Sequence, residues 1–340
     1  MSDRLTIRDI AKMAGVSPTV VSFVINGKEG VNRQTREKVL EIVKNTGFTP
    51  NLSSRRLTLK KSFNIGIAFT SDSSPFSNFF YFEVAQGLLE KSKDYGYNIV
   101  FIGVEKVNNK YNLPDIIEKG DADGIVFLIN VDKAILDALA ERKVPAVLVD
   151  YHGTDTSVPC VNVDYERSAY VATRHLIEHG HQDIAFLSQN SVPNFYNQVF
   201  AGFRRALDES DILIPLNWVC SANDEAQTIA AIKSIVSGKK RPTAIFCSTD
   251  DLAIQAMAYL KKQGFRIPED ISFIGIDDIV LSQYTDPQLT SVRIDKREMG
   301  AQAMELIMRI MEGKSPEDIV VCSDHLIPRQ SVKTVSRSEE

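Results

Sequence analysis

The chain has few cysteines and no long apolar run. Its 340 residues include four cysteines that lie far apart and form no C-x-x-C pair. Such cysteines are typical of buried free thiols in a reducing compartment rather than of disulfides or a metal cage. No stretch reaches the roughly 18–20 apolar residues of a membrane span, and the N-terminal residues MSDRLTIRDI lack the apolar core of a signal peptide. We therefore expect a cytoplasmic protein with no membrane partner.

The motifs of several enzyme classes are also missing. The sequence has no G-x-S-x-G, P-loop or H-E-x-x-H. The stretch RHLIEHGH holds His175, His179 and His181, but no acidic or cysteine partner lies at ligand spacing for a metal. Asp277 and Asp278 in GIDDI could suggest a paired-carboxylate site. We expect no catalytic residue, no metal and no cofactor.

Charge is distributed unevenly along the chain, whose net charge is −5. Residues 1–62 hold 12 Lys and Arg against 5 Asp and Glu, a net charge of +7, whereas the remainder carries −12. A basic segment on an acidic protein indicates that this segment meets a polyanion such as nucleic acid. The alternative is a chance fluctuation over a short stretch.

Two short helices are predicted at the N-terminus. Thr6 and Asp9 fit a capping box for the first, and Gly15 can end it. Ser17 can cap the second, with Pro18 at its first helical position. A helix, a tight turn and a second short helix form the helix-turn-helix pattern, whose second helix enters the major groove of DNA with its N-terminal residues leading.

Helical spacing predicts which side chains of this segment turn inward. Val21, Val24 and Ile25 can join the core, and a third helix capped by Asn32 would close it. The apolar stripe of that third helix is Val39, Leu40 and Val43. The outward residues of the second helix are Pro18, Thr19, Ser22 and Phe23. Around the start of the third helix lie Lys28, Arg33, Arg36 and Lys38, which suit phosphate contacts or, individually, a solvated charged face.

The segment TPNLSSRRLTLKKS, residues 49–62, is polar and basic with one apolar anchor, Leu57. Asn51 or Ser53 could cap a short helix here, but isolated helices under roughly 12–15 residues seldom persist in water. Such a helix would order on a partner. Leu57, beside Arg55 and Arg56, suits a wedge into a DNA minor groove. The alternative is a plain linker.

From residue 63 the chain alternates apolar strands with amphipathic helices. Runs such as FNIGIAFT, ADGIVFLI, DIAFLSQ and ISFIGID predict strands, and stretches such as KAILDALAERK and DDLAIQAMAYLKKQG predict helices between them. Short apolar strands separated by helices indicate βαβ units and parallel sheets. We expect an α/β core of two such sheets, with a ligand cleft between the carboxyl ends of their strands.

The N-terminal residues resemble a known family. The segments TIRDIAKMAGVS, VSFVINGKEGVNRQTREKV and GFTPN, with the trailing RRL, resemble the signature of the LacI/GalR family of bacterial transcriptional regulators, and the likeness continues to near residue 331. The resemblance implies a homodimer that reads a near-palindromic double-stranded DNA operator, with hinge helices whose Leu57 opens a central base step. It also implies a small-molecule effector, a carbohydrate or related metabolite. No leucine-rich heptad tail follows residue 331, which argues against a tetramer built that way.

The resemblance assigns DNA binding to one set of residues. They are Thr6, Ser17, Pro18, Thr19, Ser22, Phe23, Asn26, Asn32, Thr35, Arg36, Asn51, Ser54, Arg55 and Leu57. Many relatives have threonine and arginine where this chain has Val20 and Phe23. Losing that arginine removes a guanine or phosphate contact, whereas Phe23 can touch a thymine methyl group. Ser54 stands where relatives usually place alanine, a better helix former.

The resemblance also implies how the core is divided. A helix-turn-helix domain, 1–48, and a hinge, 49–62, would precede a periplasmic-binding-protein-like core, 63–331. The chain would cross between two subdomains three times, near 160–163, 291–294 and 321–324. The N-subdomain would comprise 63–161 and 293–321, and the C-subdomain 162–290 and 322–331. A polar, frayed tail, 332–340, would follow.

Effector-binding residues follow from the same resemblance. They are Asp72, Phe76, Phe79, Phe195, Val199, Asp224, Thr249 and Asp277. Relatives carry an arginine where this chain has Val199, and some carry an aromatic residue where it has Asp224. Less positive charge and an added carboxylate argue against an acidic effector. Two alternatives remain for the site: it binds a neutral or amino-bearing ligand, or it is vestigial.

These observations together predict a dimeric DNA-binding transcriptional regulator, assigned as a repressor. One alternative is a solute-binding protein without DNA function, which the basic N-terminal segment and the missing signal peptide disfavour. A sugar-modifying enzyme is disfavoured because no nucleophile or phosphate motif is present. A regulator that needs no effector, or one that depends on a protein corepressor, remains an alternative.

Overall fold

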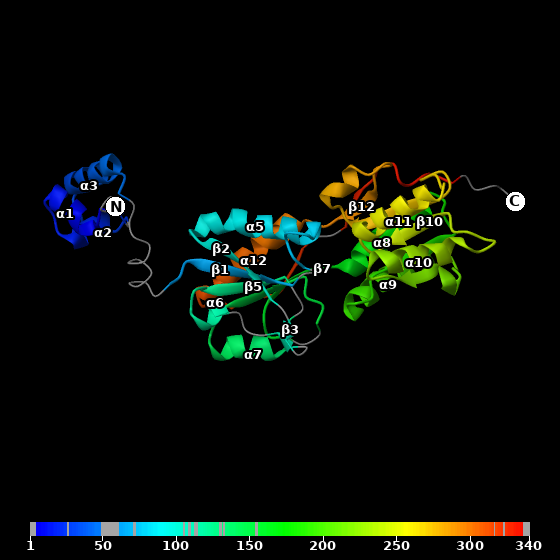
Figure 1. The fold of residues 1–340 in the computed structure, drawn as a ribbon, viewed down its shortest axis with the longest axis horizontal. Helices are drawn as coiled ribbons and strands as arrows, with labels where there is room; N and C mark the ends of the chain where they lie inside the picture. Colours follow the sequence, from blue (N-terminus) through cyan, green and yellow to red (C-terminus); the bar gives the residue numbers. More distant parts are fainter. Residues whose placement is uncertain are drawn as a thin grey trace. The chain divides into compact units, whose positions relative to one another are not determined.

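The chain forms two compact units, Met1–Phe63 and Asn64–Glu340, which we call the head and the body (Figure 1). The computed structural model describes residues 5–25, 27–48, 61–70, 73–104, 106–107, 110–111, 115–128, 131, 133–153, 156–315, 317–321 and 324–335. The predicted hinge helix, with Asn51, Ser54, Arg55 and Leu57, lies outside the described residues.

The head consists of helices α1 (Ile7–Ala14), α2 (Pro18–Ile25) and α3 (Arg33–Thr46). The predicted capping box is present: the Asp9 carboxylate accepts from the Thr6 amide at 2.8 Å, and the Asp9 amide donates to Thr6 Oγ1. Ser17 Oγ accepts from the amide of Val20 at 3.3 Å. Asn32 Oδ1 accepts from the amide of Thr35 at 2.8 Å. Side-chain caps at the start of each helix thus replace the backbone partners that a first turn lacks.

The core of the head is small and lies where the three helices meet. Its buried residues are Ile10, Ala11, Ala14, Val21, Val24, Val39 and Phe48. The expectation that Leu40 belongs to this core is wrong, since 47% of Leu40 is exposed. Successive helical residues point about 100° apart, so the residue after buried Val39 turns away from the core. Ile42 and Val43 pack against it instead.

The body holds two six-stranded sheets. In the first, all neighbouring strands run parallel. Across that sheet the order is β13 (Ile319–Val321), β7 (Cys160–Val163), β6 (Ala146–Val149), β5 (Gly124–Phe127), β1 (Asn64–Phe69) and β2 (Asn98–Gly103). A separate hairpin pairs β3 (Lys106–Val107) with β4 (Lys110–Tyr111).

The second sheet is parallel except at one edge, where β12 and β14 run antiparallel. Its order is β14 (His325–Ile327), β12 (Thr290–Arg293), β11 (Ser272–Asp277), β10 (Ala244–Cys247), β8 (Ile184–Ser188) and β9 (Val219–Ser221). The predicted α/β class with two parallel sheets is therefore confirmed. The strand-like surroundings of Cys160 and Cys322 in the sequence correspond to β7 and β13, whereas β9, β12 and β14 are additions to the sequence prediction.

Helices cover both sheets, and none of those described is long and apolar enough to cross a membrane. With the first sheet are α5 (Phe79–Tyr95), α6 (Asp115–Glu118), α7 (Lys133–Glu141) and α12 (Lys296–Met311). With the second are α8 (Tyr165–Glu178), α9 (Pro193–Asp208), α10 (Glu225–Val236) and α11 (Asp250–Lys262). Short 3-10 turns lie at η1 (Leu216–Trp218) and η2 (Val280–Gln283). We call each sheet with its helices the first and the second subdomain.

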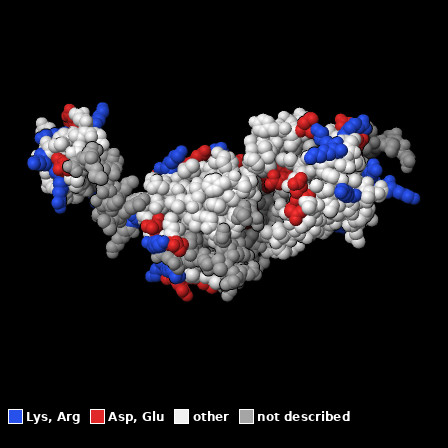
Figure 2. Space-filling model, viewed as in Figure 1, with Lys and Arg blue, Asp and Glu red and all other residues white. Residues whose placement is uncertain are grey.

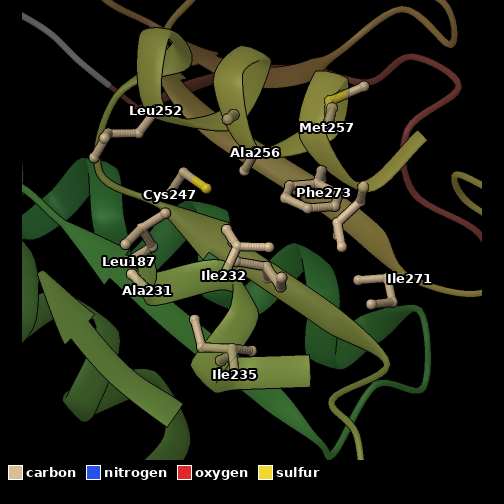
Figure 3. Packing of buried hydrophobic residues seen from close by; sticks show 14 of the residues in the cluster. Leu187, Ala231, Ile232, Ile235, Cys247, Leu252, Ala256, Met257, Ile271 and Phe273 are labelled. Atoms are coloured by element: carbon tan, nitrogen blue, oxygen red, sulfur yellow. The ribbon is translucent and has the colours of Figure 1, made fainter. Parts of the chain in front are cut away.

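Glycines let α5 and α12 approach each other closely. A Cβ on Gly87 would lie 2.0 Å from the Arg297 carbonyl oxygen, and one on Gly300 would lie 2.0 Å from the Val84 carbonyl oxygen. Any side chain at either position would separate the helices. In the second subdomain, larger residues fill the interior. Figure 3 shows Leu187, Cys247 and Phe273 of the sheet packed with Ile232 of α10 and Met257 of α11.

The chain exchanges between the two subdomains where β7 is followed by α8, β12 by α12, and β13 by β14. The first sheet keeps the chain through Val163, and the second keeps it through Arg293. The boundaries expected at 161/162 and 290/293 therefore fall inside strands β7 and β12. The third exchange lies between Val321 and His325, where it was expected, near 321–324.

Residues 332–335 are bound to the body, so the expectation of a frayed tail starting at 332 is wrong for them. Buried Ser331 Oγ donates to the Phe273 carbonyl at 2.6 Å, and the Lys333 amide donates to Ser272 Oγ at 3.1 Å. The Val335 amide donates to the His179 carbonyl at 2.8 Å. Polar composition predicted solvent exposure, but these backbone groups bond to the second subdomain. Residues 336–340 lie outside the described part.

Candidate functional sites

The first candidate site is the exposed face of α2 in the head. Val21 and Val24 are buried, whereas Ser17, Pro18 and Thr19 at the start of the helix are exposed. Residues whose side chains point away from a core can contact another molecule at little cost in stability. Figure 2 shows Lys and Arg side chains on several parts of the head, with Asp and Glu side chains among them. The exposed start of a helix, in a segment with a net charge of +7 over residues 1–62, suits contact with nucleic acid.

Phe23 projects from the same helix, with 36% of its surface exposed. The ammonium of Lys28 lies 5.5 Å from the centre of its ring, within the range of a cation–π interaction. Arg36 fixes the loop before α3, since its Nη2 donates to the Lys28 carbonyl at 2.5 Å. Ser22 and Thr35 are half-buried. Asn26 lies outside the described residues.

Three of the predicted DNA-binding residues have a structural role as helix caps. Thr6, Ser17 and Asn32 each accept an amide hydrogen bond at the start of a helix. All three are nevertheless exposed. Backbone and side-chain groups at helix N-termini are frequent phosphate-binding groups in protein–DNA contacts. The caps therefore place polar atoms where a DNA backbone can reach them.

The second candidate site is a cavity of about 130 Å³ in the body, lined by residues of both subdomains. The lining consists of Asn78, Phe80, Tyr81, Asp150, His152, Tyr165, Gln189, Val192, Phe195, Thr249, Asp251 and Asp277. Many of these residues follow strands: Asp150 follows β6, Gln189 follows β8, and Thr249 follows β10. The carboxyl ends of parallel strands are the usual position of a ligand site in α/β folds.

A hydrogen-bonded cluster around Asp150 forms one side of the cavity. Tyr81 Oη donates to Asp150 Oδ2 at 2.9 Å, and Tyr165 Oη donates to Asp150 Oδ1 at 2.7 Å. His152 Nε2 lies 3.2 Å from Asp150 Oδ1. Tyr81 and Asp150 belong to the first subdomain and Tyr165 to α8 of the second, so the cluster joins the two.

The electrostatics of this cluster favour an ionised carboxylate with neutral phenols. Burial alone would raise the pKa of Asp150, but attraction to His152 and the three hydrogen bonds outweigh it, and the pKa lies below its usual value. Burial, followed by the nearby Asp150 charge, raises the pKa of Tyr81 and Tyr165 well above the ordinary value. The hydrogen-bonding capacity of Asp150 is therefore largely used within the protein.

Asp277 forms the opposite side of the cavity and is held differently. It ends β11 with a φ of 115°, a conformation that side chains rarely adopt, and only 7% of the residue is exposed. Burial and the Asp250 carboxylate behind it raise the pKa of Asp277 well above its usual value. Strain of this kind clusters at ligand sites because it fixes the direction of a functional side chain.

Asp250 lies behind Asp277 and does not line the cavity. Its carboxylate accepts from Ser282 Oγ at 2.5 Å, Ser291 Oγ at 2.6 Å and the Ile279 amide at 3.0 Å. Burial raises its pKa to about 7, against the opposing effect of these bonds. Thr249, which does line the cavity, caps α11 by accepting from the Leu252 amide. Asp250 therefore supports the loop after β11 from inside.

Of the effector-binding residues expected from the sequence, Phe195, Thr249 and Asp277 line the cavity. Phe76 does not, because it is 72% exposed and packs edge-on against Phe69 and beside Phe101. The remaining expected residues, Phe79, Val199 and Asp224, are also absent from the lining, and Asp72 lies outside the described residues.

Each departure has a local cause. Asn78 caps α5, so the first turn of that helix directs Phe80 and Tyr81, rather than Phe79, to the cavity. Val199 is fully buried on α9. Asp224 caps α10 by accepting from the Gln227 amide at 2.8 Å. Sequence reasoning missed Asp150 and Gln189, although both follow predicted strands, and that position was the signal that could have found them.

The candidate metal cluster of the sequence is not formed. Among the described residues, no group of three His, Cys, Asp or Glu side chains could hold a metal ion. His175 and His179 lie ring against ring, with 4.1 Å between their centres. His181 is buried, with Nδ1 2.9 Å from Thr243 Oγ1 and Nε2 3.0 Å from the Lys333 carbonyl oxygen. These contacts serve the fold.

Comparison with known proteins matches both units. Residues 6–51 match the family of bacterial regulatory proteins named lacI, and residues 173–332 match the periplasmic binding protein-like domain. The chain is 33% identical to the HTH-type transcriptional repressor PurR of Photobacterium profundum, over 97% of this chain and 99% of that protein. It is also 33% identical to catabolite control protein A of Priestia megaterium, with the same coverage of 97% and 99%.

The chain belongs to the LacI family. Among solved structures, the lac repressor dimer bound to operator and the anti-inducer ONPF has the same fold, with a TM-score of 0.77 and 24% identity over 97% of this chain and 100% of that one. The predicted family and periplasmic-binding-protein-like core are confirmed. The protein is an effector-controlled, DNA-binding transcriptional regulator and not an enzyme, as the sequence predicted. Family members bind operator DNA and small molecules and act as dimers.

Proposed function

We propose that this LacI-family protein is a repressor that binds a near-palindromic operator through α2 of each head in a dimer. The observation that carries the proposal is the exposed start of α2, Ser17 to Thr19, together with Phe23, on a helix-turn-helix whose other face is buried. The leading residues of such a helix reach base edges, and the basic residues around α3 contact phosphates. We expect the protein to act in the cytoplasm, where bacterial DNA lies.

Base recognition by this head differs from that of an arginine-bearing relative. Phe23 offers an apolar ring, which suits a thymine methyl group, and Lys28 keeps a positive charge next to it. For the hinge, we propose that Leu57 wedges into the minor groove at the centre of the operator, while the neighbouring Arg55 and Arg56 contact the flanking phosphates. We therefore expect an operator with thymines in each half-site and a flexible central pyrimidine–purine step.

Exposed apolar side chains of the body support the proposed dimer. Phe82 and Leu89 lie seven residues apart on α5, where they share one face of the helix, and both are exposed. Phe101 is exposed on β2, an edge strand. In the second subdomain, Val280, Leu281 and Tyr284 are exposed, the last by 75%. A twofold dimer would cover such surfaces with the same surfaces of a second copy.

The cavity supports a polar effector that is not acidic. Its described lining contains three carboxylates and no Lys or Arg. Aromatic side chains, among them Phe80 and Phe195, supply apolar walls. An anion placed there would face like charges without a compensating cation. A carbohydrate or a related metabolite with hydroxyl or amino donors suits these acceptors and walls.

The cavity also suggests how a ligand controls the head. Its lining comes from both subdomains, so a ligand that contacts Phe80 of the first and Asp277 of the second changes the free energy of the arrangement in which the two subdomains are closed around it. A ligand that binds one arrangement more tightly shifts the population toward it. We propose that this shift changes the spacing of the two heads in the dimer and thereby operator affinity.

The experiment that tests this function is selection of binding sites from random duplex DNA by the purified full-length protein at two salt concentrations. We expect enrichment of a near-palindrome with a central pyrimidine–purine step at both concentrations. A variant with Phe23→Ala should select a sequence altered at one position in each half-site, and Leu57→Ala should weaken binding without changing the half-sites. Enrichment of nothing, or only of generic DNA that is lost as salt rises, would contradict the proposal.

A further inference from the structure

Asp277 and Asp278, at the end of β11, differ in the partners of their carboxylates. Asp278 is paired with two cations, since its carboxylate lies 2.8 Å from Arg293 and 2.5 Å from Arg329. Asp277 lines the cavity, is more than nine-tenths buried, and accepts no hydrogen bond to its carboxylate from any residue that the structure describes. A buried carboxylate without a partner is costly, so its position at a ligand site points to a partner supplied from outside.

The nearest buried cation does not fill that role. Lys296 Nζ donates to the backbone carbonyl oxygens of Asp277 at 2.5 Å, Asp278 at 3.2 Å and Ile294 at 3.3 Å. The side chain closest to this ammonium is Glu83, whose carboxylate lies 3.7 Å away. The three hydrogen atoms of an ammonium are thus directed to carbonyl groups. Lys296 therefore binds the backbone of the turn at Asp277 and Asp278, and it does not donate to the Asp277 carboxylate, which lines the cavity.

A second acidic side chain stands beside Asp277. Asp251 in the first turn of α11 also lines the cavity, is exposed, and is close enough to Asp277 for its charge to raise the pKa of that residue. The third lining carboxylate, Asp150, already has bonds from Tyr81, Tyr165 and His152. The cavity therefore offers two carboxyl groups on the second subdomain that no Lys or Arg of the described lining pairs with, and one on the first whose hydrogen bonds are made within the protein. Burial raises the pKa of Asp277 and of Asp251, and a cation beside them would stabilise their ionised forms.

We propose that the effector carries a protonated amine, which binds to the carboxylates of Asp277 and Asp251. The inference rests on the proposed role of the cavity as the effector site and names the chemistry of its ligand. The amine donates to Asp277 at the inner end of the cavity and to Asp251 at the mouth, while the rest of the molecule packs between Phe80 and Phe195. Charge-assisted hydrogen bonds of this kind are roughly twice as strong as neutral ones.

The aromatic walls support a cationic ligand in a second way. Phe195 packs edge-on against Tyr165, with 4.8 Å between ring centres, and against His152 at 5.5 Å. Phe80 is held in the same manner by Tyr81 at 5.2 Å. Aromatic faces attract ammonium groups, and the attraction is strongest when both partners are desolvated. A ligand with an amine next to an apolar or hydroxylated skeleton would use both kinds of contact.

Calorimetric titration of the full-length protein with matched compounds tests the inference. One set is glucosamine, glucose and glucuronate; the other is putrescine, butane-1,4-diol and succinate. Within a set the skeleton is similar and the charge changes from positive through neutral to negative. We expect the amine to bind at least about tenfold more tightly than the neutral and acidic members of at least one set, as a hydrogen bond to a charged partner implies.

Substitutions in the cavity locate the binding. Asp277→Asn should abolish this preference for the amine, and Asp251→Asn should reduce it. Asp208→Asn is the control, because Asp208 lies at the end of α9, outside the cavity, in an exposed ion pair with Arg204. Thermal unfolding without ligand shows whether each variant is folded. If Asp277→Asn is unstable, Asp251→Asn still decides the outcome, since that side chain is exposed.

Two results would overturn the inference. One is a neutral or acidic member that binds as tightly as its amine counterpart in both sets, or no binding by either amine. The other is unchanged amine binding in both cavity variants. Operator binding measured in parallel separates this failure from that of the proposed function. Intact operator binding without amine binding refutes the amine alone, whereas loss of specific operator binding in the wild-type protein refutes the regulator.

Discussion

The head and the body of this protein place their functional residues in opposite environments. The described core of the head consists of seven residues, and its candidate DNA contacts stand on the surface. The body packs clusters of 18 and 12 buried residues, and its candidate ligand contacts lie in a cavity between two sheets. In the head, the recognition residues are exposed, and three of them, Thr6, Ser17 and Asn32, also cap helices. In the body, no residue of these two clusters lines the cavity, so its recognition residues are enclosed but lie outside the clusters.

The largest expected effect is on the small core of the head. Ile10→Ala removes a fully buried side chain from a core of seven residues. Such a change costs about 2–5 kcal/mol, which is a large share of the stability of a unit this small. We expect fast hydrogen exchange throughout α1, α2 and α3 and loss of operator binding, with exchange in the body unchanged. Leu40→Ala on the exposed side of α3 is the control and should leave exchange in the head slow.

The next largest effect is expected from removing the C-terminal segment, whose backbone bonds to the second subdomain. Deleting residues 332–340 removes the Lys333 carbonyl that accepts from His181 Nε2 and the Val335 amide that donates to His179. Unpaired buried polar groups cost about 1–3 kcal/mol each, so the body should unfold at clearly lower denaturant concentration. Deleting only residues 336–340 retains both bonds and should have no effect. Equal stability of the two truncated proteins would show that the bonds to residues 333–335 contribute nothing.

The two units should also respond differently to acid, because all five histidines lie in the body. Burial lowers the pKa of His175 and of His181 to about 4. In the unfolded chain each of these histidines titrates near pH 6.5, whereas in the folded protein it stays neutral down to about pH 4. Each therefore contributes to the free energy of unfolding above pH 6.5, and this contribution, about 2 kcal/mol in order of magnitude, is lost as the pH falls toward 4. The raised pKa of Asp250 acts with the opposite sign, because folding then takes up a proton.

Direct titration separates these opposing contributions. NMR spectra of the imidazole groups should show His175 and His181 neutral down to about pH 4. Groups facing His181 include Lys333, His179 and His175, and the same spectra follow the two histidines. A midpoint near the ordinary value of about 6.5 for His181 would mean that the segment 331–335 does not cover it. The head has no histidine, so the protection of its amides against hydrogen exchange, relative to the intrinsic rate at each pH, should stay unchanged over this range.

The smallest expected effect on stability comes from Phe23→Ala in the head. Phe23 is outside the core and contacts Lys28, so unfolding should change by no more than about 1 kcal/mol. Operator affinity should nevertheless fall by about 1–3 kcal/mol if the ring meets a base. Anisotropy of a labelled operator and chemical unfolding measure the two quantities on one preparation. A fall in stability as large as the fall in affinity would show that Phe23 supports the fold of the head rather than contacting DNA alone.

The sequence predicted the second-subdomain side of the cavity better than the first. Thr249 and Asp277 follow apolar strands, and parallel strands bring such positions to one edge of a sheet. On the other side, Phe76 and Phe79 were expected where Phe80 and Tyr81 lie. The cap at Asn78 sets where α5 begins, and a shift of one or two residues rotates every later side chain around the helix axis.

Contacts between distant elements could not be predicted from local pattern. The bonds of Asp150 to Tyr81, Tyr165 and His152 join a strand end to two helices, and no periodicity in the sequence marks them. Short strands such as β12 and β14 carry too few residues for a recognisable alternation. The helices of the head were predicted correctly because caps, turn residues and apolar spacing all agree there.

We propose that the cavity of the body controls DNA binding by the head. The most direct test is the affinity of the full-length protein for its selected operator, measured with and without a saturating amine that binds the cavity, in the wild type and in Asp277→Asn. We expect operator affinity to change by about 5–150-fold in the wild type and to stay constant in the variant. Unchanged operator affinity in the wild type with the cavity occupied would contradict the account.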